Sequence, residues 1–409
     1  MSTQETSQTV VIAGAGHGAG QVVASLRQHK FAGRIVMIGD EPYLPYQRPP
    51  LSKKFLAGEM PPERLYFKPE SFYDDPQIDV MLGTRVTSID RAGHTVSTDG
   101  GAEIAYDKLV LALGSRVREV PVEGADLPGV HYLRSIADVD GIRDDMLNRK
   151  SVVIVGAGYI GLEVAAVCCQ RGLQVTVIEL ADRVMSRVVS PHVSDYYQVQ
   201  HTEHGVRLLL STGLAGFEGK RRVRQVLTTD GQKLPADFVV VGVGILPNAE
   251  LAADAGLDCA DGIVVDDRCQ TGDPDIYAIG DCTSHPNGIY ERQLRLESVH
   301  NALEQAKTAA SNICGQESHY SQVPWFWSDQ YDIKLQIAGL SEGYDEVVLR
   351  GDPSAGSFAC FYLADGVLIA VDAINSPREF MQSKSLIASR ARPDPGKLAD
   401  PEIALKDLG

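Results

Sequence analysis

Two glycine-rich turns contain the residues whose types and spacing point most directly to chemistry. Residues 14–19 read Gly-Ala-Gly-His-Gly-Ala, and residues 156–161 read Gly-Ala-Gly-Tyr-Ile-Gly. Glycines at this spacing let the backbone turn tightly from a strand into a helix and approach a pyrophosphate, which binds the exposed N–H groups of the helix N-terminus. An acid follows each turn after a second apolar run, Asp40 in the first copy and Glu179 in the second. The spacing predicts two dinucleotide sites.

The acid after the second turn indicates which dinucleotide binds there. A carboxylate at Glu179 accepts hydrogen bonds from the adenosine ribose and repels a 2′-phosphate, so the sequence favours NAD over NADP. Arg183 and Arg187 follow closely and either soften this preference or are solvated charges at the entry of the next helix. The second turn matches the whole G-x-G-x-x-G pattern, whereas Ala19 occupies the third position of the first turn. Two turns with different flanking sequences indicate two different dinucleotides.

A third feature points to a flavin. The apolar run at 276–279 ends in Gly280 and Asp281, and a carboxylate at that place can accept hydrogen bonds from the ribitol hydroxyls of a flavin. The helix expected over 297–313 points its N-terminal dipole beyond it, which would stabilise negative charge on a reduced flavin ring. The alternative is an ordinary strand and turn in which Asp281 caps a helix. A flavin enzyme supplied by NADH is the simplest arrangement that uses both glycine turns.

The elements that must position these residues are two βαβ units. Apolar runs precede and follow each glycine turn, with helical spacing between them: 9–13, 35–38, 151–155 and 175–178. Such units form parallel sheets covered by helices. From about residue 323 both tryptophans, Trp325 and Trp327, appear among alternating strand-like segments. We predict an α/β fold with two Rossmann-like dinucleotide-binding domains, glutathione-reductase-like in architecture, and a C-terminal α+β domain.

The domains are expected to interleave along the chain. The two halves are built alike, because the apolar run 238–241 ends in glycines as the run 108–113 does. We predict three domains: a FAD-binding domain over 1–114 and 248–322, an NAD-binding domain over 115–247, and a C-terminal domain over 323–409.

Composition and charge exclude several classes of protein. The chain has 409 residues, of which 44% are hydrophobic, and a net charge of −16. The longest basic run is 220–222, which argues against a nucleic-acid partner, and the longest apolar runs are strand-sized, which argues against a membrane span. Residues 1–8 are polar and lack the features of a signal peptide. Seven scattered cysteines without C-x-x-C spacing predict reduced thiols in a cytoplasmic protein.

Five segments in combination resemble one enzyme family. They are residues 46–53 (YQRPPLSK), 156–163 (GAGYIGLE), 279–282 (IGDC), 297–299 (ESV) and 324–330 (PWFWSDQ). They are similar to the NADH-dependent, FAD-containing ferredoxin reductases of bacterial oxygenase systems, over nearly the whole chain. The resemblance implies a flavoprotein that takes a hydride from NADH and passes electrons singly to a [2Fe–2S] ferredoxin, which supplies a cytochrome P450 or a Rieske-type oxygenase. A flavin is needed because nicotinamide moves two electrons and the cluster accepts one.

The resemblance also implies roles for particular residues. On the FAD pyrophosphate and ribose it places Gly14, Gly16, Gly18 and Asp40. Around the rest of FAD it places Arg48, Lys53, Val86, Arg134, Asp281 and Val299. On the NAD side it places Gly156, Gly158, Ile160, Gly161, Glu163, Glu179 and Gly244. The side chains that it implies in catalysis are Lys53 near the isoalloxazine, Glu163, Tyr159 as the aromatic that gates nicotinamide access, and Trp327 beside the flavin. The resemblance thus also implies that the C-terminal domain covers the flavin.

Other interpretations stay open at this point. A disulfide, peroxide or oxygen reductase needs a redox-active cysteine near the flavin, and the absence of any cysteine before Cys168 argues against it. A flavin-binding signalling protein of the apoptosis-inducing-factor type shares the fold, but tends to need a basic face or a targeting leader, and we find neither. Lys53 and Glu163 could form only an ion pair between domains, and Trp325 and Trp327 could be plain core residues.

Docking of an acidic ferredoxin would require positive charge on part of the surface. Small [2Fe–2S] ferredoxins are acidic as a class and this chain is itself acidic, so attraction must come from a local basic patch. Candidates near the flavin helix and Trp327 are Lys68, Arg292, Arg295, Lys307 and Lys334. We expect a monomer or a weak dimer.

Overall fold

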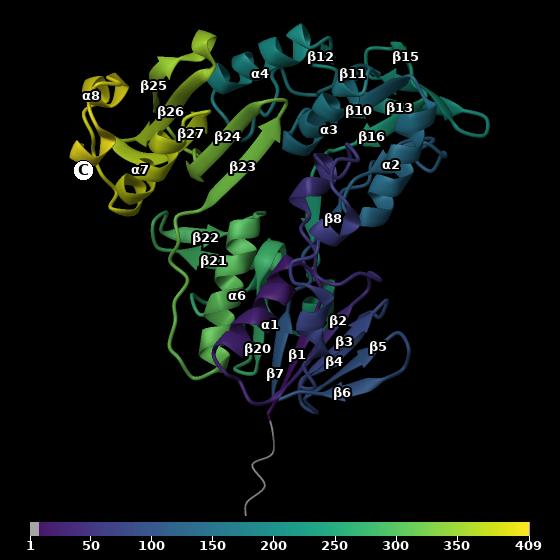
Figure 1. Ribbon diagram of the computed structural model, residues 1–409, viewed down its shortest axis with the longest axis vertical. Helices are drawn as coiled ribbons and strands as arrows, with labels where there is room; N and C mark the ends of the chain where they lie inside the picture. Colours follow the sequence, from purple (N-terminus) through teal and green to yellow (C-terminus); the bar gives the residue numbers. More distant parts are fainter. Residues whose placement is uncertain (1–7, 409) are drawn as a thin grey trace, which may run out of the picture. The chain divides into compact units, whose positions relative to one another are not determined.

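The computed structural model describes residues 8–408, which divide into two compact units (Figure 1). Unit 1 contains the described part of Met1–Gln47, together with Glu63–Arg116 and Leu246–Pro324. Unit 2 contains Arg48–Pro62, Val117–Ile245 and the described part of Trp325–Gly409. Each unit therefore contains one of the two glycine turns.

The centre of unit 1 is a five-stranded parallel sheet in the order β20-β7-β1-β2-β3. Its strands are β1 (Thr9–Ala13), β2 (Arg34–Gly39), β3 (Ile78–Leu82), β7 (Lys108–Leu111) and β20 (Ile276–Ala278). β1 is apolar from Val10 to Ala13 because both of its faces are buried there: Val10 and Ile12 belong to one core cluster, and Val11 and Ala13 to another. The glycine turn after β1 is thus fixed at the carboxyl edge of a buried strand.

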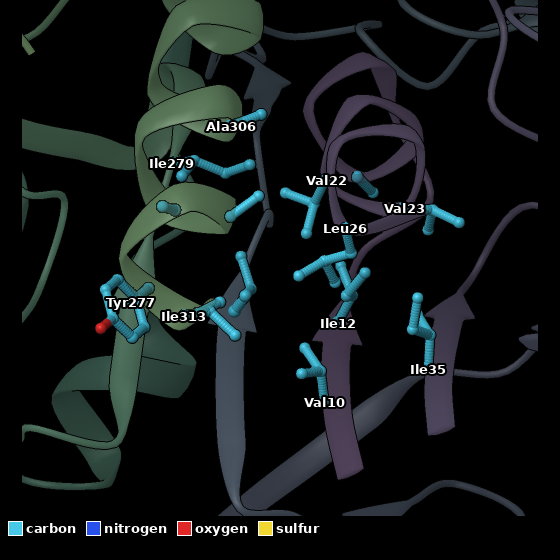
Figure 2. Close-up of a cluster of buried hydrophobic side chains, with 14 of the residues drawn as sticks. Val10, Ile12, Val22, Val23, Leu26, Ile35, Tyr277, Ile279, Ala306 and Ile313 are labelled. Atoms are coloured by element: carbon cyan, nitrogen blue, oxygen red, sulfur yellow. The ribbon is translucent and has the colours of Figure 1, made fainter. Parts of the chain in front are cut away.

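Two helices that are distant in sequence lie side by side on this sheet. Helix α1 (His17–Gln28) follows the glycine turn, and α6 (Val299–Ile313) contacts it along its length. Figure 2 shows Val22 and Leu26 of α1 meeting the sheet next to Ala306 and Ile313 of α6. This packing brings the N-termini of both helices to the same sheet.

Smaller elements complete unit 1. An antiparallel sheet contains β4 (Val86–Asp90), β5 (Thr95–Thr98) and β6 (Glu103–Ala105). A second small sheet contains β18 (Cys259–Ala260), β19 (Gly262–Val264), β21 (Thr283–Asn287) and β22 (Arg292–Leu294), and the short helix α5 is Glu250–Asp254.

Unit 2 repeats the parallel architecture in the order β12-β11-β10-β16-β9. The strands are β9 (Val130–Tyr132), β10 (Ser151–Val155), β11 (Gln174–Ile178), β12 (Arg207–Leu209) and β16 (Phe238–Val241). The helices are α2 (Ile136–Asn148), α3 (Tyr159–Gln170) and α4 (Pro191–Glu203), and a small antiparallel sheet adds β13 (Leu214–Gly219), β14 (Val223–Thr228) and β15 (Lys233–Pro235).

The C-terminal part of unit 2 is a five-stranded antiparallel sheet in the order β23-β24-β27-β26-β25. The strands are β23 (Trp325–Gln330), β24 (Ile333–Gly339), β25 (Glu346–Asp352), β26 (Ser357–Ala364) and β27 (Val367–Ile374), accompanied by α7 (Pro377–Ala388) and α8 (Pro395–Ala399). Strand β23 lies at the edge of this sheet and contacts α3, as does the 3₁₀ helix η1 (Pro49–Ser52). Two segments that are distant from α3 in sequence therefore contact this helix.

Membrane insertion by a helix would require a long apolar segment. Within residues 8–408, no helix has both the length and the apolar character to cross a bilayer.

Candidate functional site

The glycine turn of unit 1 leaves the N-terminus of α1 accessible to an anion. Gly14 has φ +116°, and a Cβ on it would lie 2.2 Å from the carbonyl oxygen of Ala112, so a side chain is excluded there. Gly16 is the N-cap of α1; among the described residues no side chain caps this helix, and open space surrounds the position of a Cβ. Unsatisfied N–H groups facing open space fit a pyrophosphate.

The turn of unit 2 has the same geometry. Gly156 has φ +100°, and a Cβ on it would lie 2.4 Å from the carbonyl oxygen of Gly242. Gly158 is the N-cap of α3 and again faces open space, without a side-chain cap from the described part of the chain. Gly161 allows α3 to begin close to the turn, because a Cβ there would lie 2.1 Å from the carbonyl oxygen of Gly156. This site also fits a dinucleotide.

The acids that follow the two turns are held differently. Glu179 accepts hydrogen bonds from the backbone N–H groups of Ala157, at 2.7 Å, and Ala181, at 2.9 Å, so its carboxylate is fixed beside the glycine turn. Asp40 is instead 58% exposed and forms an ion pair with Arg85 at 3.2 Å. The carboxylate of Glu179 is therefore preorganised by the backbone, and that of Asp40 is not.

Arg183 is a structural residue of the loop between β11 and α4. Its guanidinium donates to the carbonyl oxygens of Ser186 and Val189 and to the hydroxyl of Ser194, at 2.7 to 2.8 Å. Arg187 is exposed. These hydrogen bonds hold the Arg183 guanidinium within its own loop and against the first turn of α4.

Asp281 does not cap a helix. It lies in a single 3₁₀ turn after β20 and accepts a 2.7 Å hydrogen bond from the hydroxyl of Ser115. The N-cap of α6 is Ser298, whose hydroxyl accepts from the N–H of Asn301 at 3.1 Å, and Val299 begins the helix. The geometry removes the capping interpretation of Asp281.

Lys53 and Glu163 form a buried ion pair within unit 2. The Nζ of Lys53 lies 2.7 Å from Oε2 of Glu163, whose side chain is only 3% exposed. Oε2 also accepts from the hydroxyl of Ser52 at 2.5 Å, and Oε1 accepts from the hydroxyl of Ser328 at 2.6 Å. A buried pair with both carboxylate oxygens satisfied is held far more firmly than a surface pair. The ion pair considered as an alternative in the sequence is therefore present, but it is buried and is not a surface pair.

Aromatic residues lie next to this ion pair. Tyr159, the first residue of α3, packs on Phe326 with ring centroids 4.8 Å apart. Its buried hydroxyl has no partner among the described residues, and burial, with the nearby charge of Asp372, raises the pKa of Tyr159 well above its usual value. The rings of Trp325 and Trp327 are tilted against each other with centroids 5.4 Å apart, and both residues are only half-buried. The tryptophans are thus not plain core residues.

The remaining predicted site residues are distributed over both units. In unit 2, Arg48 donates a hydrogen bond to the carbonyl oxygen of Arg134 at 2.6 Å. Ile160, beside the glycine turn, is 43% exposed, and Gly244 has φ +105°. In unit 1, Gly18 allows α1 to approach Ile279, and Val86 begins β4.

Comparison with known proteins decides the family. The family model for pyridine nucleotide-disulphide oxidoreductases matches residues 8–306, and the reductase C-terminal model matches residues 325–409. The chain belongs to the pyridine nucleotide-disulphide oxidoreductase family. Rhodocoxin reductase of Rhodococcus erythropolis is 44% identical over 97% of this chain and 93% of the relative, and putidaredoxin reductase of Pseudomonas putida is 41% identical over 98% and 97%.

Solved structures of this oxidoreductase family agree in fold. A ferredoxin reductase for the CYP199A2 system from Rhodopseudomonas palustris has a TM-score of 0.95 and 44% identity, covering 98% of this chain and 99% of that one. The reductase in a covalent putidaredoxin reductase–putidaredoxin complex also has a TM-score of 0.95, with 41% identity, and covers 98% of both chains. The predicted fold class, the flavoenzyme with FAD and NAD as cofactors, and the ferredoxin reductase assignment are confirmed.

Some features of the oxidoreductase site escaped the sequence analysis. Ser52 and Ser328 complete the hydrogen bonding of Glu163. Both lie in segments that carry the family resemblance, 46–53 and 324–330, but nothing in those segments marks the two serines as partners of Glu163. Two of the expected docking cations are already neutralised: Arg295 pairs with Asp261 and Glu297, and Lys307 pairs with Glu304. The basic patch expected for docking is thus weaker than the sequence suggests.

Proposed function

We propose that this oxidoreductase accepts a hydride from NADH beside Lys53 and Glu163 and delivers electrons one at a time to a [2Fe–2S] ferredoxin that supplies a P450 or Rieske-type oxygenase. The observation that carries the proposal is the fully coordinated, buried Glu163 carboxylate, one turn into the helix that follows the NAD-type glycine turn. Relatives named as reductases of rhodocoxin and putidaredoxin support the ferredoxin partner.

Unit 1 has the residues that would hold FAD, the group that accepts a hydride and releases its electrons singly. Gly14 and Gly18 let the chain turn closely past its neighbours, Gly16 leaves open space for a pyrophosphate, and Asp40 and Asp281 would offer carboxylates to the ribose and ribitol hydroxyls. We assign Val86 and Val299, also in unit 1, to the rest of its surroundings. The assignment of Arg48 and Arg134, which lie in unit 2, to FAD rests on the family resemblance alone. We also retain the division into a FAD-binding domain (1–114 and 248–322), an NAD-binding domain (115–247) and a C-terminal domain (323–409), the last supported by the match at 325–409.

Unit 2 has the residues that would bind NADH. Gly156 and Gly161 allow the close turn and Gly158 leaves open space for the pyrophosphate, while Glu179 would select an unphosphorylated ribose. We also assign the exposed Ile160 and Gly244 to the NAD side. The paired charges of Lys53 and Glu163 are fixed before substrate arrives, so no reorganisation is required during the reaction. Tyr159 and Trp327 shape the apolar surroundings of these charges.

We propose a cytoplasmic protein, monomeric or weakly dimeric, without a nucleic-acid or membrane partner. All seven cysteines are free, which suits a reducing compartment. The net charge of −16 disfavours binding to nucleic acid or to an anionic lipid surface.

The test is electron transfer from NADH to several purified [2Fe–2S] ferredoxins, with ferricyanide as a small acceptor in parallel. We expect rapid ferredoxin reduction with at least one partner and ferricyanide reduction regardless of partner. NADH oxidation that never reduces a ferredoxin would contradict the proposal and favour a signalling role.

A further inference from the structure

A chain of buried hydrogen bonds leads away from Glu163 through unit 2. The hydroxyl of Ser328, which donates to Oε1 of Glu163, accepts from Nε2 of Gln330 at 3.2 Å. Oε1 of Gln330 lies 2.8 Å from Nε2 of His201, and Nδ1 of His201 lies 3.1 Å from the hydroxyl of Tyr331. Ser328, Gln330 and His201 are each at most 1% exposed. Water therefore does not compete for these bonds.

The chemistry of the side chains gives this chain one direction. An ionised Glu163 can only accept, so the single hydroxyl proton of Ser328 must point to it, and the oxygen of Ser328 must accept from the Gln330 amide. The Gln330 oxygen then faces His201, so the proton of the neutral imidazole must be on Nε2 of His201. Nδ1 of His201 is consequently the acceptor for the Tyr331 hydroxyl. Burial lowers the pKa of His201 to about 4, so the imidazole is neutral at pH 7, as this order of donors requires.

The reverse order fails at one point. If the Gln330 amide were turned over, its oxygen and that of Glu163 would both face Ser328, which has only one proton to donate. One buried acceptor would then lie against another without a hydrogen, which is costly. Every donor in the chain therefore points toward the carboxylate of Glu163.

We propose that Ser328, Gln330 and His201 are positioning residues that orient Glu163 for reaction with NADH. This inference rests on the role proposed for Glu163 above. Each bond fixes the orientation of the next side chain, and the last one fixes Oε1, the oxygen that does not contact Lys53. Strand β23 supplies Ser328 and Gln330, and α4 supplies His201, so the chain connects the C-terminal sheet to the carboxylate next to the glycine turn.

Two matched pairs of variants test the direction of the chain. Ser328→Ala removes the donor to Glu163 and Ser328→Thr keeps it; His201→Leu removes the donor to Gln330 and His201→Gln keeps one near Nε2. We expect the alanine and leucine variants to slow NADH-dependent ferricyanide reduction roughly tenfold, mainly in kcat, because small misplacements at a reacting centre are expensive. The threonine and glutamine variants should retain most of the rate.

A double-mutant cycle separates positioning from a merely structural role. In a Glu163→Gln background, the further change Ser328→Ala should have no additional effect on kcat, because the chain acts through the carboxylate. Binding of ADP-ribose, which lacks the nicotinamide, should be unchanged in all variants, since the glycine turn and Glu179 are intact.

Three outcomes are distinguishable. A normal rate in Glu163→Gln itself would contradict the proposed role of Glu163. A slow Glu163→Gln enzyme with normal Ser328→Ala and His201→Leu enzymes would overturn the positioning chain alone. Additive losses in the double variant, or equal losses in the conservative partners, would show that the two residues act on stability and would also overturn it.

Discussion

The two glycine turns share a backbone conformation but differ in what closes around them. In unit 1, Gly18 faces Ile279, which lies 3.0 Å from the place of a Cβ, so α1 is covered by neighbouring chain immediately after the turn. The equivalent position in unit 2 is Ile160, whose side chain is 43% exposed. A turn closed by its own unit suits a cofactor that stays bound, whereas an open turn suits a substrate that must leave after each cycle.

The third position of the motif differs as well. Ala19 is fully buried and its Cβ is accommodated, whereas a Cβ at Gly161 would lie 2.1 Å from the carbonyl oxygen of Gly156. The pattern G-x-G-x-x-G thus requires its last glycine only where the helix begins in contact with the turn. The following changes break or sharpen this comparison.

The largest effect is expected from Gly161→Ala. Its Cβ would displace the backbone of the turn, and kcat/KM for NADH should fall roughly 100-fold because the pyrophosphate cradle is distorted. The opposite change in the other unit, Ala19→Gly, should leave flavin content and kcat/KM nearly unchanged. Steady-state kinetics with ferricyanide measure both, and a normal Gly161→Ala enzyme would contradict the steric argument.

One buried titratable group in each unit should give opposite pH dependences of the free energy of unfolding. Desolvation raises the pKa of Asp372 in unit 2 to about 7, against an ordinary 3.8, although the hydroxyl of Tyr362 donates to it. The folded state therefore binds the extra proton between pH 4 and 7, and its stability decreases as pH rises through that window. Desolvation lowers the pKa of His285 in unit 1 to about 4, so its contribution is lost as pH falls below about 6.5.

Asp372→Asn isolates the first of these contributions. Between pH 5 and pH 8 the free energy of unfolding of the unchanged chain should fall by about 1–3 kcal/mol relative to that of the variant. The variant does not show this fall because asparagine has no proton to lose. Thermal unfolding at both pH values measures the difference. If the free energies of unfolding of the variant and the unchanged chain differ by the same amount at pH 5 and pH 8, Asp372 does not titrate in this range.

Glu179→Ala should change selectivity by a smaller factor. We expect kcat/KM of the unchanged enzyme to be about 100-fold higher for NADH than for NADPH, and this ratio to be about tenfold smaller in the variant. The reason is that the Glu179 carboxylate is fixed where it would repel a 2′-phosphate. The matched control is Asp40→Ala in unit 1, which should leave the ratio as it was. Comparable kcat/KM for the two nucleotides before mutation would refute the assignment.

The smallest effects concern docking of the ferredoxin. Lys334→Glu in unit 2 should lower ferredoxin reduction by roughly three- to fivefold at low salt and leave ferricyanide reduction unchanged. Lys307→Glu in unit 1 should have less effect, because that lysine already pairs with Glu304. Equal losses with both acceptors would indicate damage to hydride transfer instead.

Local patterns were sufficient to predict the elements that carry the cofactor sites. The helix expected over 297–313 is observed as Val299–Ile313, because Ser298 caps it, and the strand expected over 108–113 ends at Leu111, where the chain approaches Gly14. These features depend on neighbours in sequence. Turn chemistry and apolar periodicity report such neighbours directly.

The environment of Glu163 could not be predicted in the same way. Its partners Ser52, Ser328 and, through Gln330, His201 come from η1, β23 and α4, which meet only when unit 2 has folded. Serine and glutamine are common on exposed surfaces, so their types carry no signal of burial. Packing of distant segments, and not local propensity, determines which polar side chains become part of the site.

Strand β23 also limits how this protein can change during evolution. The two faces of the strand have different roles. On one face Trp325 and Trp327 form an aromatic pair, and on the other Ser328 and Gln330 belong to the buried hydrogen-bond chain. A substitution alters one of these side chains at a time. An inserted or deleted residue would shift the register by one and move every later side chain to the opposite face, exchanging tryptophan for polar groups in a single event. Length variation between residues 325 and 330 should therefore be eliminated by selection even in relatives whose side chains there differ.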